Sequence, residues 1–266
     1  MELLKKATEL EENNQAFVIA TVTDVQGSAP GKIGFKILVQ SNSSIFGTVG
    51  GGAIEKHIIE ESLDRLKRSA SGMANYILSQ NARETKDVKV IPMSCSGRIS
   101  VFYEVYGSKP TVYVFGGGHV GQALLYTLQP LGWYSILIDN RPEFADKGKN
   151  PSADEIIFQE YEKYANKFTP VENSFVIILT HGHKYDSKIL NILYKRKLSF
   201  PYIGVIASKS KAIVLLKNLK EKIGEKIDTS VIHSPVGLNI GGNSAAEIAL
   251  AIAAEMQSIR YNRESS

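Results

Sequence analysis

The sequence predicts an α/β protein in two parts: an N-terminal α+β domain over residues 1–107, and a Rossmann-like domain with a doubly wound parallel sheet over residues 110–260. The order of the expected elements carries this prediction. Strands follow one another in the first part, whereas strands and helices alternate in the second. A Gly-Ser-Lys-Pro stretch at residues 107–110 separates the two parts and indicates a linker.

The N-terminal domain is expected to contain two helices and a run of short strands. An amphipathic pattern predicts a helix over residues 2–14, and apolar residues at helical spacing predict another over residues 53–70. Segments rich in Val, Ile and Thr predict strands over residues 16–25, 35–39, 45–49, 73–78, 88–91 and 99–106.

The C-terminal domain is expected to alternate between apolar strands and helices. The strands are predicted over residues 111–115, 134–139, 155–158, 175–179, 202–206 and 229–233. Helices are predicted from near His119 to before Pro130, and over residues 187–196, 210–222 and 244–256. Ser244 and Glu247 fit a capping box at the start of the last helix, which accounts for both residues without a ligand.

The composition excludes several classes of protein. Of the 266 residues, 43% are apolar and 22% are charged, which excludes a disordered chain. The apolar runs are far shorter than the roughly 20 residues that a bilayer span requires. The single cysteine excludes an internal disulfide and favours a reducing compartment. No stretch is basic enough to indicate a nucleic-acid partner. We therefore expect a cytoplasmic protein that binds neither membranes nor nucleic acids.

The glycines are concentrated in three short stretches. Of 22 glycines, seven lie within residues 27–52, four within residues 116–121 and three within residues 237–242. Glycine adopts backbone conformations that other residues avoid and lets a ligand approach the main chain closely. The three stretches therefore indicate loops shaped around a ligand.

A G-x-G-x-x-G pattern begins at Gly116, directly after an expected strand and at the start of an expected helix. In this context Gly116 would permit a tight turn, Gly118 would let a phosphate approach the backbone, and Gly121 would let helix and strand pack closely. His119, at the helix start, is expected beside the same ligand. Asp139 ends the next strand and would accept a hydrogen bond from a ribose hydroxyl, which favours NAD. The alternative is a glycine turn with a purely structural role.

Two histidines follow another expected strand of this sheet. His181, His183 and Asp186 form an H-x-H-x-x-D pattern, which differs from the H-x-H-x-D-H zinc motif of one class of hydrolases. Alternate residues of an extended segment point to opposite sides, so the two histidines would not converge on one ion. Polar contacts from His181 and His183 to a bound ligand are favoured, and no metal site is predicted.

The only cysteine, Cys95, lies in a loop between two expected strands. A lone cysteine of this kind is often a small buried apolar residue. The flanking Ser94, Ser96 and Gly97 favour instead an accessible loop, in which a thiolate would serve as a soft metal ligand or a nucleophile.

Further motifs extend over nearly the whole chain: Gly27-Ser28-Ala29-Pro30 with Gly34, the run from Gly47 to Glu55, Cys95-Ser96-Gly97 with Glu104, Val114 to Gly121, Asp139 to Phe144, Thr180 to His183, Tyr202 to Gly204, and Pro235 to Leu238 leading to Glu247-Ile248-Ala249. In this order they resemble the XdhC/CoxI family, the xanthine dehydrogenase accessory proteins. The chain departs from the family pattern at Gly31, where arginine is usual, and at Ser96, where glycine is usual.

The resemblance implies an accessory protein rather than the dehydrogenase itself. Family members are thought to bind the molybdenum cofactor (molybdopterin) and to hand its sulfurated form to a molybdenum hydroxylase. The implied partners are that hydroxylase, of the xanthine dehydrogenase type, and a cysteine desulfurase. Carried over to this chain, Cys95 would contact the molybdenum or take part in sulfur transfer. Gly50, Gly51 and Gly52 would let the backbone approach the pterin, and the later glycine turn would hold the phosphate or dinucleotide.

Two enzymatic alternatives remain. An NAD(P)-dependent oxidoreductase would use the glycine turn at residues 116–121, although the chain has no Tyr-x-x-x-Lys pair of the short-chain dehydrogenase type. A metal-dependent hydrolase would depend on the two histidines and Asp186. For any of these functions a homodimer is expected, because symmetric dimers are the commonest oligomers.

Overall fold

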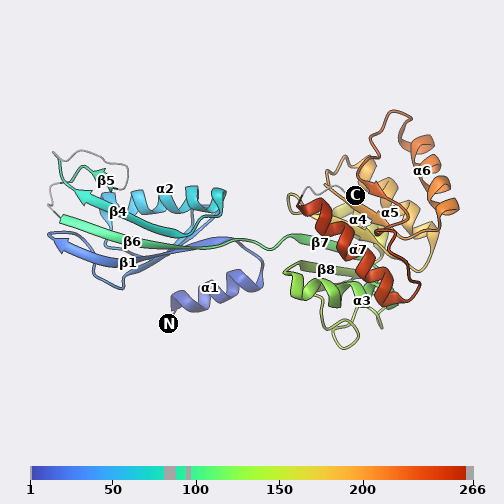
Figure 1. Ribbon diagram of the computed structural model, residues 1–266, viewed down its shortest axis with the longest axis horizontal. Helices are drawn as coiled ribbons and strands as arrows, with labels where there is room; N and C mark the ends of the chain where they lie inside the picture. Colours follow the sequence, from blue (N-terminus) through green and yellow to red (C-terminus); the bar gives the residue numbers. More distant parts are fainter. Residues whose placement is uncertain (1, 81–87, 94–96, 262–266) are drawn as a thin grey trace. The chain divides into compact units, whose positions relative to one another are not determined.

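The computed structural model describes residues 2–80, 88–93 and 97–261. The chain divides into two compact units, Met1–Ser108 and Lys109–Ser266. Each unit contains one six-stranded sheet with helices, and the second sheet is entirely parallel (Figure 1). The predicted fold class, an N-terminal α+β part followed by a Rossmann-like part, is confirmed.

The N-terminal sheet is mostly antiparallel, with the strand order β3-β2-β1-β6-β4-β5. Among its described strands, only β4 and β5 pair in parallel. The strands are β1 (Phe17–Gly27), β2 (Lys36–Gln40), β3 (Ile45–Gly47), β4 (Gly72–Leu78), β5 (Val88–Ile91) and β6 (Gly97–Tyr106).

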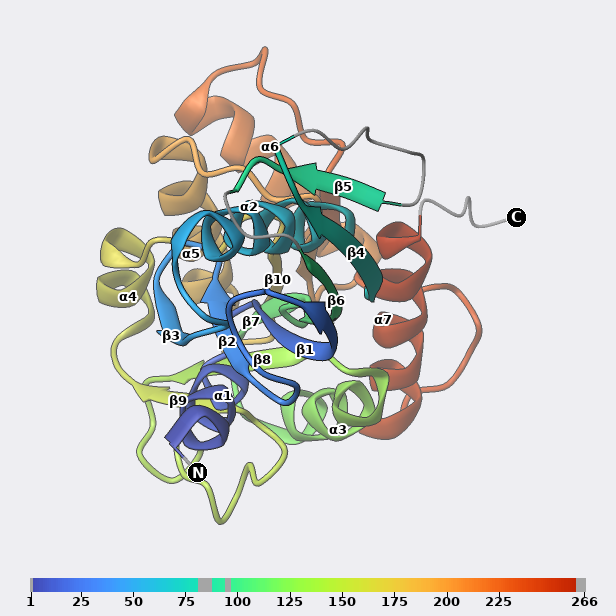
Figure 2. The ribbon, with the colours of Figure 1, turned by 90° about the vertical axis from the view of Figure 1, so that its left-hand side faces the viewer.

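Two helices pack on opposite faces of this sheet, α1 (Glu2–Glu12) and α2 (Gly52–Arg68) (Figures 1 and 2). Because side chains alternate along a strand, β1 contributes to both contacts. Val18 and Ala20 belong to the core beneath α2, and Phe17 and Ile19 pack with Leu10 of α1.

The C-terminal sheet has the order β12-β11-β10-β7-β8-β9. Its strands are β7 (Thr111–Phe115), β8 (Tyr134–Asp139), β9 (Glu155–Phe158), β10 (Phe175–Ile178), β11 (Ile203–Val205) and β12 (Ile232–His233). Its helices are α3 (His119–Leu128), which continues into a short 3-10 turn η1 (Gln129–Leu131), α4 (Tyr161–Lys167), α5 (His183–Lys195), α6 (Lys209–Ile223) and α7 (Ala245–Arg260).

Helices cover both faces of the parallel sheet, which explains its unbroken apolar strands. Residues of α3 and α7 form one core with Val112 and Val114 of β7, and residues of α4 and α5 form the other with Tyr113 and Phe115. Every residue of β7 and β8 is buried. No helix in the described ranges is long and apolar enough to cross a membrane.

Local details differ from the sequence expectations at two helices. Helix α5 begins at His183, four residues earlier than expected, and α4 was not predicted. The predicted capping box of α7 is confirmed, because Ser244 Oγ accepts from the Glu247 N–H and the Glu247 carboxylate accepts from the Ser244 N–H.

Candidate functional site

The order of the parallel strands reverses beside β7. The chain enters the sheet at β7, adds β8 and β9 on one side, and then adds β10 on the other. In sheets of this kind, ligands bind beyond the carboxyl ends of the strands at the point of reversal. The loops that follow β7, β8 and β10 therefore form the candidate site of the C-terminal unit.

Close backbone packing fixes the glycine turn after β7. A Cβ atom on Gly116, whose φ is +116°, would lie 2.4 Å from the Leu179 carbonyl oxygen. A Cβ atom on Gly121 would lie 2.1 Å from the Gly116 carbonyl oxygen. Both distances are far below van der Waals contact, so a side chain at either position would clash with the backbone. The two glycines therefore let the turn pack directly against α3 and against the loop after β10.

Gly118 differs from its neighbours because a Cβ atom added to it would point into open space. The nearest atom to an added Cβ is the Arg141 Nη2, at 3.9 Å. Gly118 is the N-cap of α3 and supplies no side-chain cap, so the first N–H groups of the helix are available to a bound anion. His119, the exposed first residue of α3, lies beside this opening.

Asp139 lies beneath the turn and is completely buried. Its Oδ2 accepts the Gly117 N–H at 2.7 Å, and Arg141 donates to both carboxylate oxygens from Nε and Nη2. Burial alone would raise the pKa of Asp139, but the hydrogen bonds from Arg141 and Gly117 lower it below its usual value. The carboxylate therefore holds the glycine turn in place, and its expected contact with a ribose hydroxyl stays a prediction.

The loops after β8 and β10 meet at this edge. His181 is exposed, and its Nε2 lies 3.3 Å from the Asn140 Oδ1. The expectation that His181 and His183 share one extended segment is wrong, because Gly182 is the N-cap of α5 and His183 begins the helix. The side chain of His183 is outside the described part of the structure. Among the described residues, no group of three His, Cys, Asp or Glu side chains is arranged to hold a metal ion.

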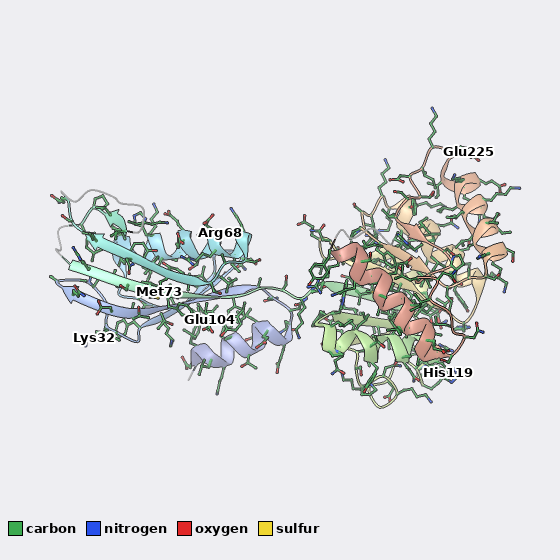
Figure 3. The ribbon with its side chains drawn as sticks, in the orientation of Figure 1. Lys32, Arg68, Met73, Glu104, His119 and Glu225 are labelled. Atoms are coloured by element: carbon green, nitrogen blue, oxygen red, sulfur yellow. The ribbon has the colours of Figure 1, made fainter. Side chains whose placement is uncertain are left out.

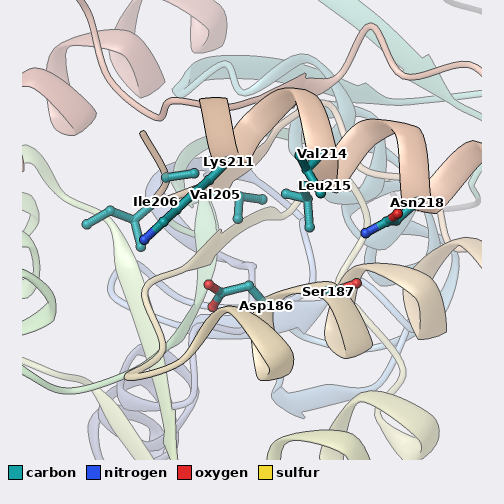
Figure 4. A pocket seen from close by; sticks show the side chains of 9 residues that line it. Asp186, Ser187, Val205, Ile206, Lys211, Val214, Leu215 and Asn218 are labelled. Atoms are coloured by element: carbon teal, nitrogen blue, oxygen red, sulfur yellow. The ribbon is translucent and has the colours of Figure 1, made fainter. Parts of the chain in front are cut away.

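A cavity of about 160 Å³ lies at the same edge, between α5 and α6 beyond the end of β11 (Figure 4). Val205, Val214 and Leu215 supply apolar walls, and Asp186 and Lys211 line it from the two helices. The buried Asp186 accepts a hydrogen bond from the Thr180 hydroxyl at 2.5 Å. Sequence reasoning gave no sign of this cavity, because it depends on how two helices pack.

The N-terminal unit has its own glycine loop at the start of α2. A Cβ on Gly50 would lie 2.5 Å from the Gly31 nitrogen, so the two glycine-rich segments pack backbone to backbone. Gly51 and Gly52 have φ values of +74° and +69°, and apart from their chain neighbours no atom of the described residues lies within 4 Å of where their Cβ atoms would be. The outer side of the loop is therefore open at these two residues.

A carboxylate on α2 organises this loop. The Glu55 Oε2 accepts from the Thr48 hydroxyl at 2.5 Å and from the Val49 and Gly51 N–H groups at 3.1 and 3.3 Å. Glu55 lies in one of the motifs of the sequence, but the motif does not predict a role for it. The available signal was a carboxylate in the first helical turn after a glycine run, a position from which it can reach the loop N–H groups.

The third glycine stretch, Glu104 and Cys95 lie outside the two glycine loops described above. The third glycine stretch packs against α7: a Cβ on Gly242 would lie 2.5 Å from the Glu247 Cβ, and the Gly237 N–H donates to Glu255. Glu104 is exposed on β6. Cys95 lies outside the described residues.

Comparison with known proteins identifies the family. The family model described as the XdhC Rossmann domain matches residues 112–256, and the model described as the XdhC and CoxI family matches residues 10–76. The chain belongs to the XdhC and CoxI family. The expected family is thus confirmed, and the Rossmann match covers the glycine turn and the parallel sheet from its second residue onward.

Several relatives share sequence with this family member. It is 29% identical to the uncharacterized protein YqeB of Escherichia coli K12, over 98% of this chain and 47% of that protein. It is 28% identical to a Bacillus subtilis protein named as a probable component of xanthine dehydrogenase, over 59% of this chain and 45% of that protein. The chain thus spans about half the length of these two curated relatives.

A third relative is similar in length. The molybdenum cofactor insertion chaperone PaoD of Escherichia coli K12 is 23% identical, over 98% of this chain and 89% of that protein. Among solved structures, a xanthine dehydrogenase from Bacillus halodurans aligns with a TM-score of 0.54 at 22% identity, over 99% of this chain and 96% of that chain. This likeness supports the fold.

Proposed function

We propose that this protein binds the molybdenum cofactor and delivers it to a molybdenum hydroxylase of the xanthine dehydrogenase type. Membership of the XdhC and CoxI family and the relative named as a molybdenum cofactor insertion chaperone support the proposal. The Bacillus subtilis relative, named for xanthine dehydrogenase, supports the class of client. A cysteine desulfurase is proposed as a second partner, and the working form is proposed to be a cytoplasmic homodimer.

The open start of α3 is the observation that carries the proposal. Molybdopterin ends in a phosphate, either free or within a dinucleotide. The unpaired N–H groups and the positive dipole of a helix N-terminus favour such an anion. Arg141 balances the charge of Asp139 beneath the turn, so this carboxylate does not repel a phosphate at Gly118.

A separate set of cofactor contacts is proposed in each unit. In the C-terminal unit, Gly116, Gly118 and Gly121 shape the phosphate site, and His119, His181 and His183 border it. In the N-terminal unit, the loop at Gly50, Gly51 and Gly52 lets the backbone approach the pterin. Cys95 contacts the molybdenum or takes part in sulfur transfer.

The test is anaerobic purification from a host that makes the cofactor, followed by molybdenum and pterin analysis. The Gly118→Asp variant keeps a favourable N-cap residue but places a negative charge at the phosphate position. We expect it to lose about tenfold or more of the bound pterin, equivalent to about 1.4 kcal/mol of repulsion. The matched control is Gly118→Ala, which adds a Cβ in open space and should retain the pterin.

Wild-type protein that carries neither molybdenum nor pterin from such a host would refute the proposal. A fluorescence titration with NADH addresses the oxidoreductase alternative in the same preparation. Binding of NADH in the absence of any pterin would favour that alternative. The burial of Asp139 argues against it, because its carboxylate has no exposed surface to offer a ribose.

A further inference from the structure

Within the described residues, part of one face of the N-terminal sheet is uncovered. Helix α1 packs over Phe17, Ile19 and Leu38 on this face, near one end of the sheet. Toward the other end, no described helix covers β1, β6, β4 and β5, and Met73 there is 50% exposed. Figure 3 shows Glu104 on this side of the sheet and Arg68 on the side of α2.

The strand register arranges the uncovered residues in rows. Asp24, Ser100, Asn75 and Val88 face one another across β1, β6, β4 and β5. The next row contains Gln26, Arg98 and Ile77. Side chains that are paired across a sheet point to the same face, so these rows share one surface.

These rows form a groove of about 400 Å³, which we call the open-face groove, lined by Asp24, Gln26, Asn75, Val88, Arg98 and Ser100 among others. This volume is within the range of small-molecule sites in proteins. Ile77 and Val88 supply apolar surface, and the other side chains supply polar contacts. The groove therefore has the mixed lining that a flat, polar heterocycle requires.

Its two charged residues offer complementary contacts. Arg98 is exposed and makes no ion pair within the described part of the chain. Asp24 accepts from the Gln26 amide through Oδ2 at 2.9 Å, and its Oδ1 has no partner among the described residues. A guanidinium binds an anionic group through paired N–H donors, and a carboxylate accepts N–H groups from a heterocycle.

A second cavity on the opposite face of the same sheet lacks these properties. It measures about 560 Å³ and includes Arg65, Arg68 and Lys89. All three cations bond to the buried Glu61, at 2.7, 3.0 and 2.5 Å. Each of these cations already has a carboxylate partner, so an anion that entered this second cavity would have to compete with Glu61.

We propose that the open-face groove is the pterin subsite of this protein. The amino and amide N–H groups of the pterin ring face Asp24 and Asn75, and the anionic dithiolene side of the cofactor faces Arg98. This inference rests on the proposed function and adds a subsite to it. A backbone contact connects the groove to the first glycine segment: a Cβ on Gly97, next to Arg98, would lie 2.8 Å from the Ser28 carbonyl oxygen.

The direct test uses 6-carboxypterin, a fluorescent pterin with an anionic substituent, titrated against the full chain. We expect Arg98→Gln to weaken binding by about tenfold, because a charge-assisted contact is lost. Asp24→Asn should weaken binding severalfold, and Arg98→Lys should restore part of the affinity. The matched control is Arg68→Gln, which removes a cation from the opposite face and should leave binding unchanged.

A second measurement separates this inference from the proposed function. Wild-type and Arg98→Gln proteins are purified anaerobically from a host that makes the cofactor, and their pterin content is compared. Equal pterin content in the two proteins overturns the pterin subsite. A loss of 6-carboxypterin binding in Arg68→Gln as large as that in Arg98→Gln also overturns it. Either result leaves the proposed cofactor function in place. Absence of cofactor from the wild type refutes the function, whereas the 6-carboxypterin titration still decides the subsite.

Discussion

The glycine loops at the starts of α2 and α3 each bind a carboxylate, and the two carboxylates differ in whether a cation is paired with them. In the C-terminal unit, the buried Asp139 binds the loop N–H of Gly117 and is ion-paired with Arg141. In the N-terminal unit, Glu55 binds two loop N–H groups and has no ion pair among the described residues. Both loops lack a side-chain N-cap, at Gly118 and Gly51 respectively.

This difference predicts different ligands for loops with similar glycine content. The start of α2 already contains an internal anion, Glu55, so a second anion is disfavoured there. The start of α3 has a neutralised carboxylate beneath it and keeps its attraction for a phosphate. A glycine-rich pattern alone therefore does not determine the charge of its ligand. The neighbouring carboxylate and its ion-pair partner must also be known.

The largest expected effect concerns the packing of the C-terminal turn. Gly121→Ala places a Cβ 2.1 Å from a backbone oxygen, and we expect a loss of about 3 kcal/mol in the free energy of unfolding. Gly118→Ala, at the open position of the same turn, should cost about 0.5–1 kcal/mol. Urea unfolding of the two variants measures both values. Equal losses would contradict the distinction between the packed and open glycines.

A smaller effect is expected at Asp139. Asp139→Asn leaves Arg141 without its countercharge in a mostly buried position, and should cost about 2–3 kcal/mol at neutral pH. Because folding lowers the pKa of Asp139, its contribution is complete above the unfolded value near 3.8 and is lost as the pH falls through the lower folded value.

The measurement is the urea midpoint of wild type and Asp139→Asn at neutral pH and at successive values below 4. The difference between the two proteins should shrink as the pH falls, because the wild-type carboxylate becomes protonated. Other carboxylates titrate in both proteins and cancel in the comparison. A difference that stays constant down to the lowest pH would show that the charge of Asp139 is not what stabilises the turn.

The smallest effect is expected at Glu55. Glu55→Gln keeps an acceptor oxygen near the loop but removes the charge, at a partly exposed position. We expect a loss of about 0.5–1 kcal/mol, measured by the same unfolding experiment. Glu60→Gln, on the exposed surface of the same helix, is the control and should have almost no effect. A loss at Glu55 as large as that at Asp139 would remove the contrast between the two loops.

The fold class could be predicted because periodicity and strand order are local signals. Helix α4 was missed because it is short and its inward residues, Tyr161 and Ala165, form no long periodic pattern. The start of α5 was placed too late because Gly182, a weak helix residue, serves as its cap.

The candidate sites were predictable only in part. Gly116, Gly118 and Asp139 share a sequence pattern, so their neighbourhood could be inferred before any contact was known. The groove at Arg98 could not, because it depends on the register of four strands that are distant in sequence. The partner of Asp139 was also unforeseen: Arg141 lies two residues away, but only the folded turn brings it onto the carboxylate.

The pairing of β1 with β6 has a consequence for synthesis on the ribosome. Phe17 pairs with Tyr106, so the first strand of the N-terminal unit acquires its central neighbour only when the last strand has emerged. Such long-range pairing is slow and leaves strand edges exposed for longer. In the C-terminal unit, β7 and β8 are separated by one helix and can pair soon after synthesis. We therefore expect one edge of β1 to stay unpaired until β6 has been synthesised.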